Sequence, residues 1–574
     1  MQVSEHSFLS WDGAKIFYRA WLPSVQAERA VLLFHRGHEH SGRWQSFATS
    51  LGMEGVALFG WDQRGHGRSD GERGRAPDLA AVIRDADRFA RHVAQTHGIP
   101  TRNTAVIAAS LGAVVATAWV HDFAPPVCAL VLAAAAFEVK LYVPLAIAFL
   151  RLKERFLSGG EVKSFVKSSM LTGDPAEQKA YEEDTLIFRQ ISVDLLLDLH
   201  DTGRRLVADA AAITTPTLVL VAGNDWVVRR KPQLEFFRKL GSRVKQLELF
   251  AAGRHALFHD TVAPAVIQTV RQFLEQSFNH DDRPDDSRAD IGSASRTEYD
   301  LLRTPSTLRW RGMQRMVKIG GAFSQGIKLG WSTGFDSGQT LDYVYKNQAA
   351  GFTPIGKMID RGYLNAVGWR GIRVRRQNLK ELLRTAIEQT AATGGNVHIL
   401  DIAAGAGRYV LETMHDLNGL GKDVSAELRD YRQANLDAAA ALATSLGVER
   451  VTFNLADAFD RQSVGSTTPR PSIAIASGVY ELFSDNDAVG RSLAGIADAL
   501  IDQGYLIYTG QPWHPQVEFI ARTLVNREGQ PWIMRRRSQA EMDSLVRAAG
   551  FEKLDQLVDR WGIFTVSLAR RVRS

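Results

Sequence analysis

A serine in a predicted tight turn is the strongest candidate for a nucleophile in this chain. Ser110 follows the apolar run 104–109 and precedes a helical pattern that begins at Leu111. Small residues, Ala108 and Gly112, stand two positions before and two positions after it, as a turn that brings a strand and a helix close together requires. Serine and small residues are common, so this pattern needs support from elsewhere in the chain.

That support comes from an acid and a histidine that follow in the chain. A serine hydroxyl becomes nucleophilic when a histidine takes its proton and a carboxylate orients that histidine. Asp225 closes the strand-like stretch 217–225, and His255 closes the stretch 247–255. The order serine, acid, histidine, each at a strand end, is the order expected after such a turn. We therefore predict a catalytic triad of Ser110, Asp225 and His255.

Acyl transfer also needs backbone N–H groups that bind the oxyanion of the tetrahedral intermediate. One donor is expected from Leu111, the residue after the nucleophile, and a second from the loop 35–43 after an earlier strand. Gly37 or Arg36 is the expected second donor.

The same loop carries His35, His38 and His40, which raises the question of a metal site. No Asp-His pair follows these histidines, and the loop already has a role, so we predict no metal there.

Two segments give these residues a family resemblance. The loop 35–43 reads HRGHEHSGR, and the stretch 61–71 reads WDQRGHGRSDG. With the triad they resemble the monoacylglycerol-lipase-like (serine aminopeptidase S33 type) α/β hydrolases over about residues 5–275. The resemblance implies an esterase or lipase that acts on acyl glycerols, lysophospholipids or related esters. Arg36 departs from the family, which usually has glycine at that position.

A second set of residues could grip a nucleotide-like cofactor. The strand-like run 397–400 is followed by Asp401 and by a turn of small residues that includes Ala403, Gly405 and Gly407. Small residues let the backbone approach a ligand closely, and the helix that follows favours negative charge at its start. A dinucleotide could use such a turn. An acid directly before the turn is instead a poor neighbour for a pyrophosphate and a good one for the ammonium group of S-adenosylmethionine.

Acids after the next two strands complete this set. Asp430 is placed to bind the ribose hydroxyls. The stretch 456–459, which includes Ala458, supplies Asp457 for the adenine amino group and Phe459 for the face of the adenine. These steps resemble class I methyltransferases over about residues 377–572, which implies S-adenosylmethionine as the cofactor. Residues after the later strands could line an acceptor site, although such residues more often belong to the core or to loops: they are Tyr480, Glu481, Gln511 and Trp513.

The elements that must position these residues alternate between strand and helix. Apolar runs without polar alternation, separated by helical patterns, predict an α/β fold with mostly parallel sheets. We expect a hydrolase domain at 1–277 with a helical lid at about 140–201, and a linker at 278–300. A basic helical segment at 301–376 and a Rossmann-like methyltransferase domain at 377–574 follow.

Composition sets the wider limits. A chain of 574 residues with 45% apolar and 23% charged residues is too long for one core and ordinary for a globular protein. Its single cysteine, Cys128, allows no internal disulfide framework. The chain starts without a signal-peptide pattern, and its apolar runs are too short to span a bilayer, so we expect a cytoplasmic protein.

The positive charge is concentrated in one segment. Residues 301–380 hold 14 Lys and Arg against 3 Asp and Glu, a local net charge of +11, whereas the whole chain carries +6. The rest of the chain therefore carries about −5. Such a patch could bind an anionic membrane surface or phosphate head groups, or could be only a solvated helical face.

These observations predict a bifunctional enzyme: a serine ester hydrolase joined to a methyltransferase with a lipid-derived, anionic acceptor. One alternative is a nucleic-acid-modifying enzyme that binds the backbone through residues 370–376. We favour it less, because the aromatic residues form no recognised stacking motif and the hydrolase half would have no role. A second alternative is a lipid-binding scaffold with both sites silent. Substrate, methyl acceptor and oligomeric state cannot be predicted from the sequence.

Overall fold

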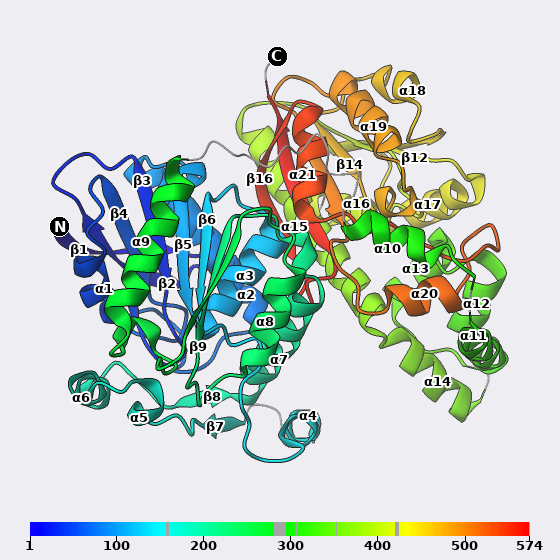
Figure 1. Ribbon diagram of the computed structural model, residues 1–574. Helices are drawn as coiled ribbons and strands as arrows, with labels where there is room; N and C mark the ends of the chain where they lie inside the picture. The colour runs from blue at the N-terminus through cyan, green and yellow to red at the C-terminus, as the bar shows by residue number, and fades with distance from the viewer. Residues whose placement is uncertain (157–159, 280–293, 306, 352, 419–423, 573–574) are drawn as a thin grey trace. The chain divides into compact units, whose positions relative to one another are not determined.

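The computed structural model describes residues 1–156, 160–279, 294–305, 307–351, 353–418 and 424–572 (Figure 1). The chain divides into two compact units, Met1–Asp285 and Asp286–Ser574. Each unit has its own sheet. Within the described residues, every helix is too short or too polar to cross a membrane.

The sheet of the N-terminal unit has eight strands in the order β1-β2-β4-β3-β5-β6-β9-β10. All neighbours from β4 to β10 pair in parallel, whereas β1 and β2 pair antiparallel at one edge. The strands are β1 (Gln2–Leu9), β2 (Lys15–Leu22), β3 (Arg29–Phe34), β4 (Val56–Trp61), β5 (Thr104–Ala109), β6 (Ala129–Ala133), β9 (Thr217–Ala222) and β10 (Lys245–Phe250). The predicted α/β fold is confirmed.

Helices cover both faces of this sheet (Figure 1). Helices α1 (Gln45–Leu51) and α9 (Ala263–Asn279) pack on one face, against side chains such as Val31 and Leu33 of β3. Helices α2 (Leu79–His97) and α3 (Leu111–Phe123) pack on the other face. There the Trp119 ring of α3 lies 6.3 Å from that of Phe34 in β3. Burial from both sides explains why the central strands are apolar without alternation.

The expected lid contains helices and a small sheet. Its elements are α4 (Ala146–Phe156), β7 (Glu161–Lys163), α5 (Ser168–Leu171), α6 (Pro175–Glu183), β8 (Gln190–Ser192) and the start of α7 (Val193–Ala208). The prediction of helices alone is wrong here, because β7 and β8 pair antiparallel. Three-residue strands are too short to show a strand period in the sequence. The pair is tied to the loop after β4, where Ser192 N donates to Gly74 O at 3.0 Å.

The sheet of the C-terminal unit has seven strands in the order β13-β12-β11-β14-β15-β17-β16. They are β11 (Val397–Asp401), β12 (Val424–Asp430), β13 (Val451–Leu455), β14 (Ile473–Ala476), β15 (Tyr505–Gly510), β16 (Phe551–Val558) and β17 (Thr565–Arg571). The first five are parallel, and β17 pairs antiparallel with both β15 and β16. The strand order reverses between β11 and β14, which is where open α/β sheets bind ligands.

Helices also cover both faces of this second sheet. Helices α15 (Val367–Ala392), α16 (Arg408–Asn418) and α17 (Gln433–Leu446) pack on one face. On the other face lie α18 (Arg461–Gly465), α19 (Asn486–Ala499) and α21 (Gln539–Ala548). The second α/β alternation predicted from the sequence is therefore present.

A further group of helices precedes and joins this unit. It comprises α10 (Ala294–Leu302), α11 (Leu308–Gly320), α12 (Gln325–Thr333), α13 (Gly338–Lys346), α14 (Pro354–Leu364), together with α20 (Val517–Thr523). The helices α10 and α11 both contact α20. At the two ends of the expected linker at 278–300, α9 runs to Asn279 and α10 starts at Ala294. Residues 280–293 lie outside the described part of the chain.

Candidate active sites

Ser110 occupies the turn between β5 and α3. Its backbone has φ 54° and ψ −115°, a conformation that side-chain-bearing residues rarely adopt. The neighbouring chains leave no room for a larger residue at Gly112, because a Cβ there would lie 2.4 Å from His35 O and 2.7 Å from Phe34 O. The turn is fixed at its other side by the bond from Ser110 N to Ala133 O at 2.9 Å. The backbone therefore presents Ser110 at the tip of the strand.

The structure brings the three expected triad residues together. His255 Nε2 lies 2.8 Å from Ser110 Oγ, and His255 Nδ1 lies 2.9 Å from Asp225 Oδ2. The other oxygen of Asp225 accepts bonds from Val227 N at 2.7 Å and Val228 N at 2.9 Å. Burial alone would raise the pKa of Asp225, but the charge and hydrogen bond of His255 and these two amides hold it below its usual value. The carboxylate is thus kept ionised to orient the imidazole.

The proposed oxyanion donors lie beside one another. A Cβ built on Gly37 would lie 3.6 Å from the Leu111 side chain, and both residues line the same cavity as Ser110 and His255. Neither amide has an acceptor among the described residues. Two adjacent free N–H groups next to the nucleophile match what an oxyanion requires.

Arg36 lies next to these donors and has a buried partner. Its Nε donates to Glu39 Oε2 at 3.0 Å, and its Nη2 donates to the other oxygen of Glu39. Burial alone would raise the pKa of Glu39, but the charge of Arg36 lowers it to about 2. Arg36, which stands where the family usually has glycine, is therefore accommodated in the loop by its ion pair with Glu39.

The loop histidines hold the loop together. His35 Nε2 accepts from Gln63 N at 2.9 Å, and His40 Nε2 lies 2.9 Å from Asp184 Oδ2 of the lid. In the described parts of the chain, no three His, Cys, Asp or Glu side chains are grouped as a metal site requires.

An apolar cavity of about 120 Å³ opens from the triad under the lid. Its apolar lining comes mostly from lid residues, namely Leu141, Val162, Phe165, Val166, Leu195, Leu196 and Leu199. Such a lining suits an acyl chain better than a polar leaving group.

A cavity of about 690 Å³ in the C-terminal unit lies at the carboxyl ends of β11 and β12, where the sequence predicts a cofactor. We call it the cofactor cavity. Six of the seven expected cofactor residues line it: Ala403, Gly405, Gly407, Asp430, Asp457 and Ala458. Gly407 has φ 60°, and a Cβ there would lie 2.5 Å from the Leu428 side chain, so the turn requires glycine. Asp430 supports the turn, since its Oδ2 accepts from Gly405 N at 2.9 Å.

Asp401 is the exception. The sequence led us to expect a contact with the ammonium group of S-adenosylmethionine, but Asp401 does not lie where it could make one. Its carboxyl group is fully buried beneath the turn, where it accepts bonds from Tyr409 OH at 2.5 Å and Ala403 N at 3.3 Å. It does not line the cofactor cavity. Burial, and then the charge of Asp430, raises the pKa of Asp401 to about 7. This carboxyl group is enclosed by protein and is only partly ionised at neutral pH. Its role is therefore to position the turn and not to bind a cation.

Further residues line the cofactor cavity, and of these the sequence predicted only Phe459, for the adenine face. Phe459, next to Ala458, packs on one wall against Phe483, with ring centroids 4.3 Å apart and planes tilted by 54°. Others come from the preceding helices and a late loop: Asp336, Asp342, Tyr345, Arg375 and Arg527. These positions are far apart in the sequence and share no spacing, so no pattern could have revealed them.

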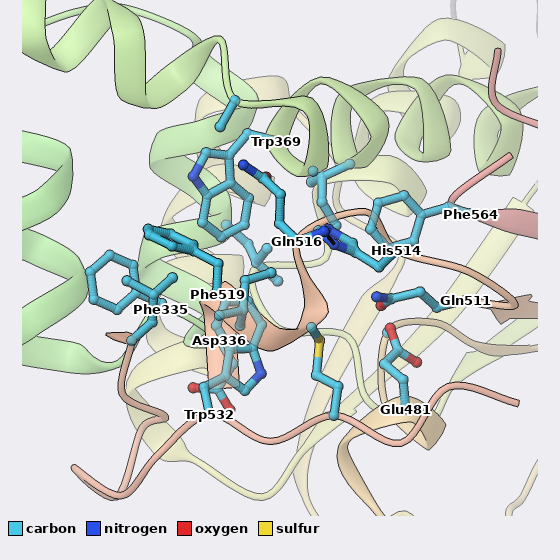
Figure 2. Close-up of a pocket in the computed structure, with 18 of the residues that line it drawn as sticks. Phe335, Asp336, Trp369, Glu481, Gln511, His514, Gln516, Phe519, Trp532 and Phe564 are labelled. Carbon is cyan, nitrogen blue, oxygen red and sulfur yellow. Dashed lines mark hydrogen bonds between the residues drawn. The ribbon is translucent and has the colours of Figure 1, made fainter. Parts of the chain in front are cut away.

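A second cavity of about 300 Å³ adjoins the cofactor cavity, and Figure 2 shows its walls. We call it the aromatic cavity, after its lining residues Phe335, Tyr363, Trp369, Phe519, Trp532 and Phe564. Five residues line both cavities: Asp336, Leu341, Arg375, Gly478 and Leu482. Of the four residues weighed for an acceptor site, Glu481 and Gln511 line the aromatic cavity, whereas Tyr480 and Trp513 do not.

These two sites, each at the strand tips of its own sheet, define a fusion of an α/β hydrolase with a methyltransferase-type domain. Comparison with known families agrees. Residues 25–262 match the family described as "Serine aminopeptidase, S33", and residues 270–571 match the family described as "Putative methyltransferase". The second match covers more than half of the chain, which therefore belongs to that family. The resemblance to both families predicted from the motifs is confirmed.

Relatives among characterised and uncharacterised proteins show the same division. "Uncharacterized protein YnbC" of Escherichia coli (strain K12) is 44% identical over 578 residues, covering 99% of this chain and 98% of that protein. The N-terminal half is 26% identical to "Monoacylglycerol lipase" of Mycolicibacterium smegmatis, covering 47% of this chain and 96% of that protein. It is also 25% identical to "Monoglyceride lipase" of Homo sapiens, covering 46% of this chain and 88% of that protein.

Proposed function

We propose that the chain is a bifunctional enzyme: a lipase-like serine ester hydrolase joined to an S-adenosylmethionine-dependent methyltransferase. The observation that carries the hydrolase half is the continuous hydrogen-bond chain from Ser110 Oγ through His255 to Asp225. The methyltransferase half is supported by the cofactor cavity over the turn that contains Gly405 and Gly407.

In the hydrolase reaction, Ser110 Oγ attacks the ester carbonyl while His255 Nε2 takes its proton. The amides of Gly37 and Leu111 bind the oxyanion, and His255 then protonates the leaving alcohol. Water, activated by the same histidine, releases the acid from Ser110. The apolar lining from the lid favours esters with an acyl chain, such as monoacylglycerols or lysophospholipids. The relatives named as monoacylglycerol lipases support monoacylglycerols among these.

The residues of the cofactor cavity fit the parts of S-adenosylmethionine. Asp430 offers a carboxylate for the ribose hydroxyls, and Asp457 with Ala458 lies where the adenine is expected. The rings of Phe459 and Phe483 offer an apolar face for the base. Bound S-adenosylmethionine supplies an electrophilic methyl group, and the protein's part is to hold donor and acceptor in line and to exclude water.

We further propose that α11 and α14 meet an anionic membrane surface. Both helices pack against α12 and expose large apolar side chains: Leu308, Met316, Ile319, Ile355 and Met358 are each more than 60% exposed. Cations are exposed beside them, namely Arg309, Arg311, Arg315, Lys318, Lys357 and Arg361. Apolar residues and cations on one face are what an interfacial helix combines.

Replacing Ser110 with alanine tests the hydrolase. The variant S110A should not be labelled by a fluorophosphonate, and its kcat for 4-nitrophenyl butyrate should fall by about a thousandfold or more, because the nucleophile is gone. The exposed serine variant S169A is the matched control and should behave like the wild type. Unchanged hydrolysis by S110A would refute the mechanism.

Calorimetric titration with S-adenosylmethionine tests the cofactor site. We expect wild-type binding, and at least about tenfold weaker binding by Asp430→Asn, because a charged acceptor for the ribose hydroxyls is lost. Asp401→Asn should stay within about threefold of the wild type, since that residue does not line the cavity. If the wild-type protein does not bind S-adenosylmethionine, the methyltransferase proposal is wrong. If D401N loses binding and D430N keeps it, the roles given to Asp401 and Asp430 are reversed.

Vesicle flotation tests the membrane surface. Vesicles with phosphatidylglycerol should bind the protein, and each cation near the surface should add about 1 kcal/mol. The triple variant R309Q/R311Q/R315Q should thus bind roughly a hundredfold more weakly, whereas the variant R230Q/K231Q/R238Q, which loses three cations of the other unit, should bind normally. Equal loss in both variants, or binding of RNA in preference to vesicles, would contradict this surface.

A further inference from the structure

We propose that the aromatic cavity is the methyl acceptor site and takes a compact ring-bearing molecule with a neutral hydroxyl group. The hydroxyl oxygen accepts the methyl group, and Glu481 takes the hydroxyl proton. This inference rests on the proposed methyltransferase function and names the substrate class of that site.

The walls of the cavity favour a flat ring. Figure 2 shows the indoles of Trp369 and Trp532 and the ring of Phe519 around the same space. The two indoles are nearly parallel, at 23°, with centroids 6.2 Å apart, and the Tyr363 ring meets Trp369 edge-on at 5.7 Å. Aromatic rings pack well against such faces and edges. The volume of about 300 Å³ is at the lower end for small-molecule sites, so the ligand must be compact.

Polar atoms without partners gather on one side of this apolar space. Glu481 and Gln511 are 8% and 3% exposed, and Glu481 Oε2 and Gln511 Nε2 have no hydrogen-bond partner within the described residues. Figure 2 shows the Gln511 amide beside the Glu481 carboxylate, with His514 next along the wall. A buried donor or acceptor without a partner costs free energy, so a ligand that supplies partners is favoured.

His514 acts in this wall as a hydrogen-bond donor. Its Nδ1 accepts a bond from Gln516 N at 3.0 Å, so in the neutral ring the hydrogen is on Nε2. The Nε2 atom faces Gly368, which also lines the cavity. Burial, and then the charge of Arg536, lowers the pKa of His514 to about 3, so the ring is neutral at physiological pH. The wall therefore offers two donors, Gln511 and His514, and one acceptor, Glu481.

A hydroxyl group matches this set of two donors and one acceptor. It gives one hydrogen to Glu481, and its two lone pairs accept from Gln511 and His514 until one of them is used for attack on the methyl carbon. A neutral amine has a single lone pair, which it needs for the attack, so the two donors would stay unsatisfied. An acidic ligand would place a second negative charge beside the Glu481 carboxylate.

The hydroxyl position faces the cofactor cavity. Arg375 lines both cavities, and its Nη1 lies 3.3 Å from Glu481 Oε1. Leu482, the next residue after Glu481, also lines both cavities. As the O–C bond forms, the O–H bond breaks and its proton passes to Glu481 Oε2. The bond between the methyl carbon and the sulfonium sulfur of the donor breaks, and its electron pair stays on sulfur. Glu481 later returns the proton to water.

Calorimetric titrations of the full chain with 2-naphthol and with its methyl ether, 2-methoxynaphthalene, test this inference without measuring turnover. Wild-type protein should bind 2-naphthol about tenfold or more tightly than the ether, because only the alcohol donates to the carboxylate. Glu481→Gln should abolish most of that preference and leave ether binding within about threefold. The exposed variant E518Q on α20 is the matched control and should keep the preference.

A second variant and a cofactor titration separate the outcomes. Gln511→Leu should weaken 2-naphthol binding by about tenfold without any change at Glu481, so the inference does not depend on one variant being folded. Equal affinity for alcohol and ether in wild-type protein that binds S-adenosylmethionine would overturn the acceptor class and leave the methyltransferase proposal standing. A hydroxyl preference in protein that does not bind S-adenosylmethionine would overturn the acceptor role together with the proposed function.

Discussion

Close packing around a strand-to-helix turn, which leaves room only for glycine, is the constraint on which both sites depend. In the N-terminal unit, Gly112 lies so near His35 O that any Cβ would collide with it, and this contact holds Ser110 at a positive φ. In the C-terminal unit, Gly407 has a positive φ, and a Cβ there would lie 2.5 Å from the Leu428 side chain instead of from a backbone atom. Parallel strands end at one edge of a sheet, so such turns collect reactive and ligand-binding groups there.

The catalytic triad and the aromatic cavity differ in how their polar side chains are paired. In the triad, His255 bonds to both Ser110 and Asp225. In the aromatic cavity, by contrast, Glu481 Oε2 and Gln511 Nε2 are buried without partners. The hydrogen bonds of the triad are already formed without a substrate, so this site is preorganised for its reaction. In the arrangement that we propose for the aromatic cavity, a bound hydroxyl group supplies the missing partners.

Much of the fold and of the hydrolase site could be predicted, because the central strands are apolar on both faces and the triad residues follow them in order. Edge elements such as β1 were missed, since partly exposed strands lack a continuous apolar run. The burial of Asp401 could not be foreseen, because its partner Tyr409 OH is fixed only by the helix after the turn. The aromatic cavity could be predicted only in part: Glu481 and Gln511 were weighed for an acceptor site, but the other lining residues come from elements spread between Val317 and Phe564.

The rate of fluorophosphonate labelling in Gly112→Ala tests the backbone constraint most directly, with Gly37→Ala as the matched control. A Cβ at residue 37 meets Leu111 at an ordinary 3.6 Å, whereas one at residue 112 would lie 2.4 Å from His35 O. The account predicts that G112A loses labelling of Ser110, that G37A keeps it, and that both still bind S-adenosylmethionine through the other unit. Labelling of G112A at the wild-type rate would contradict it.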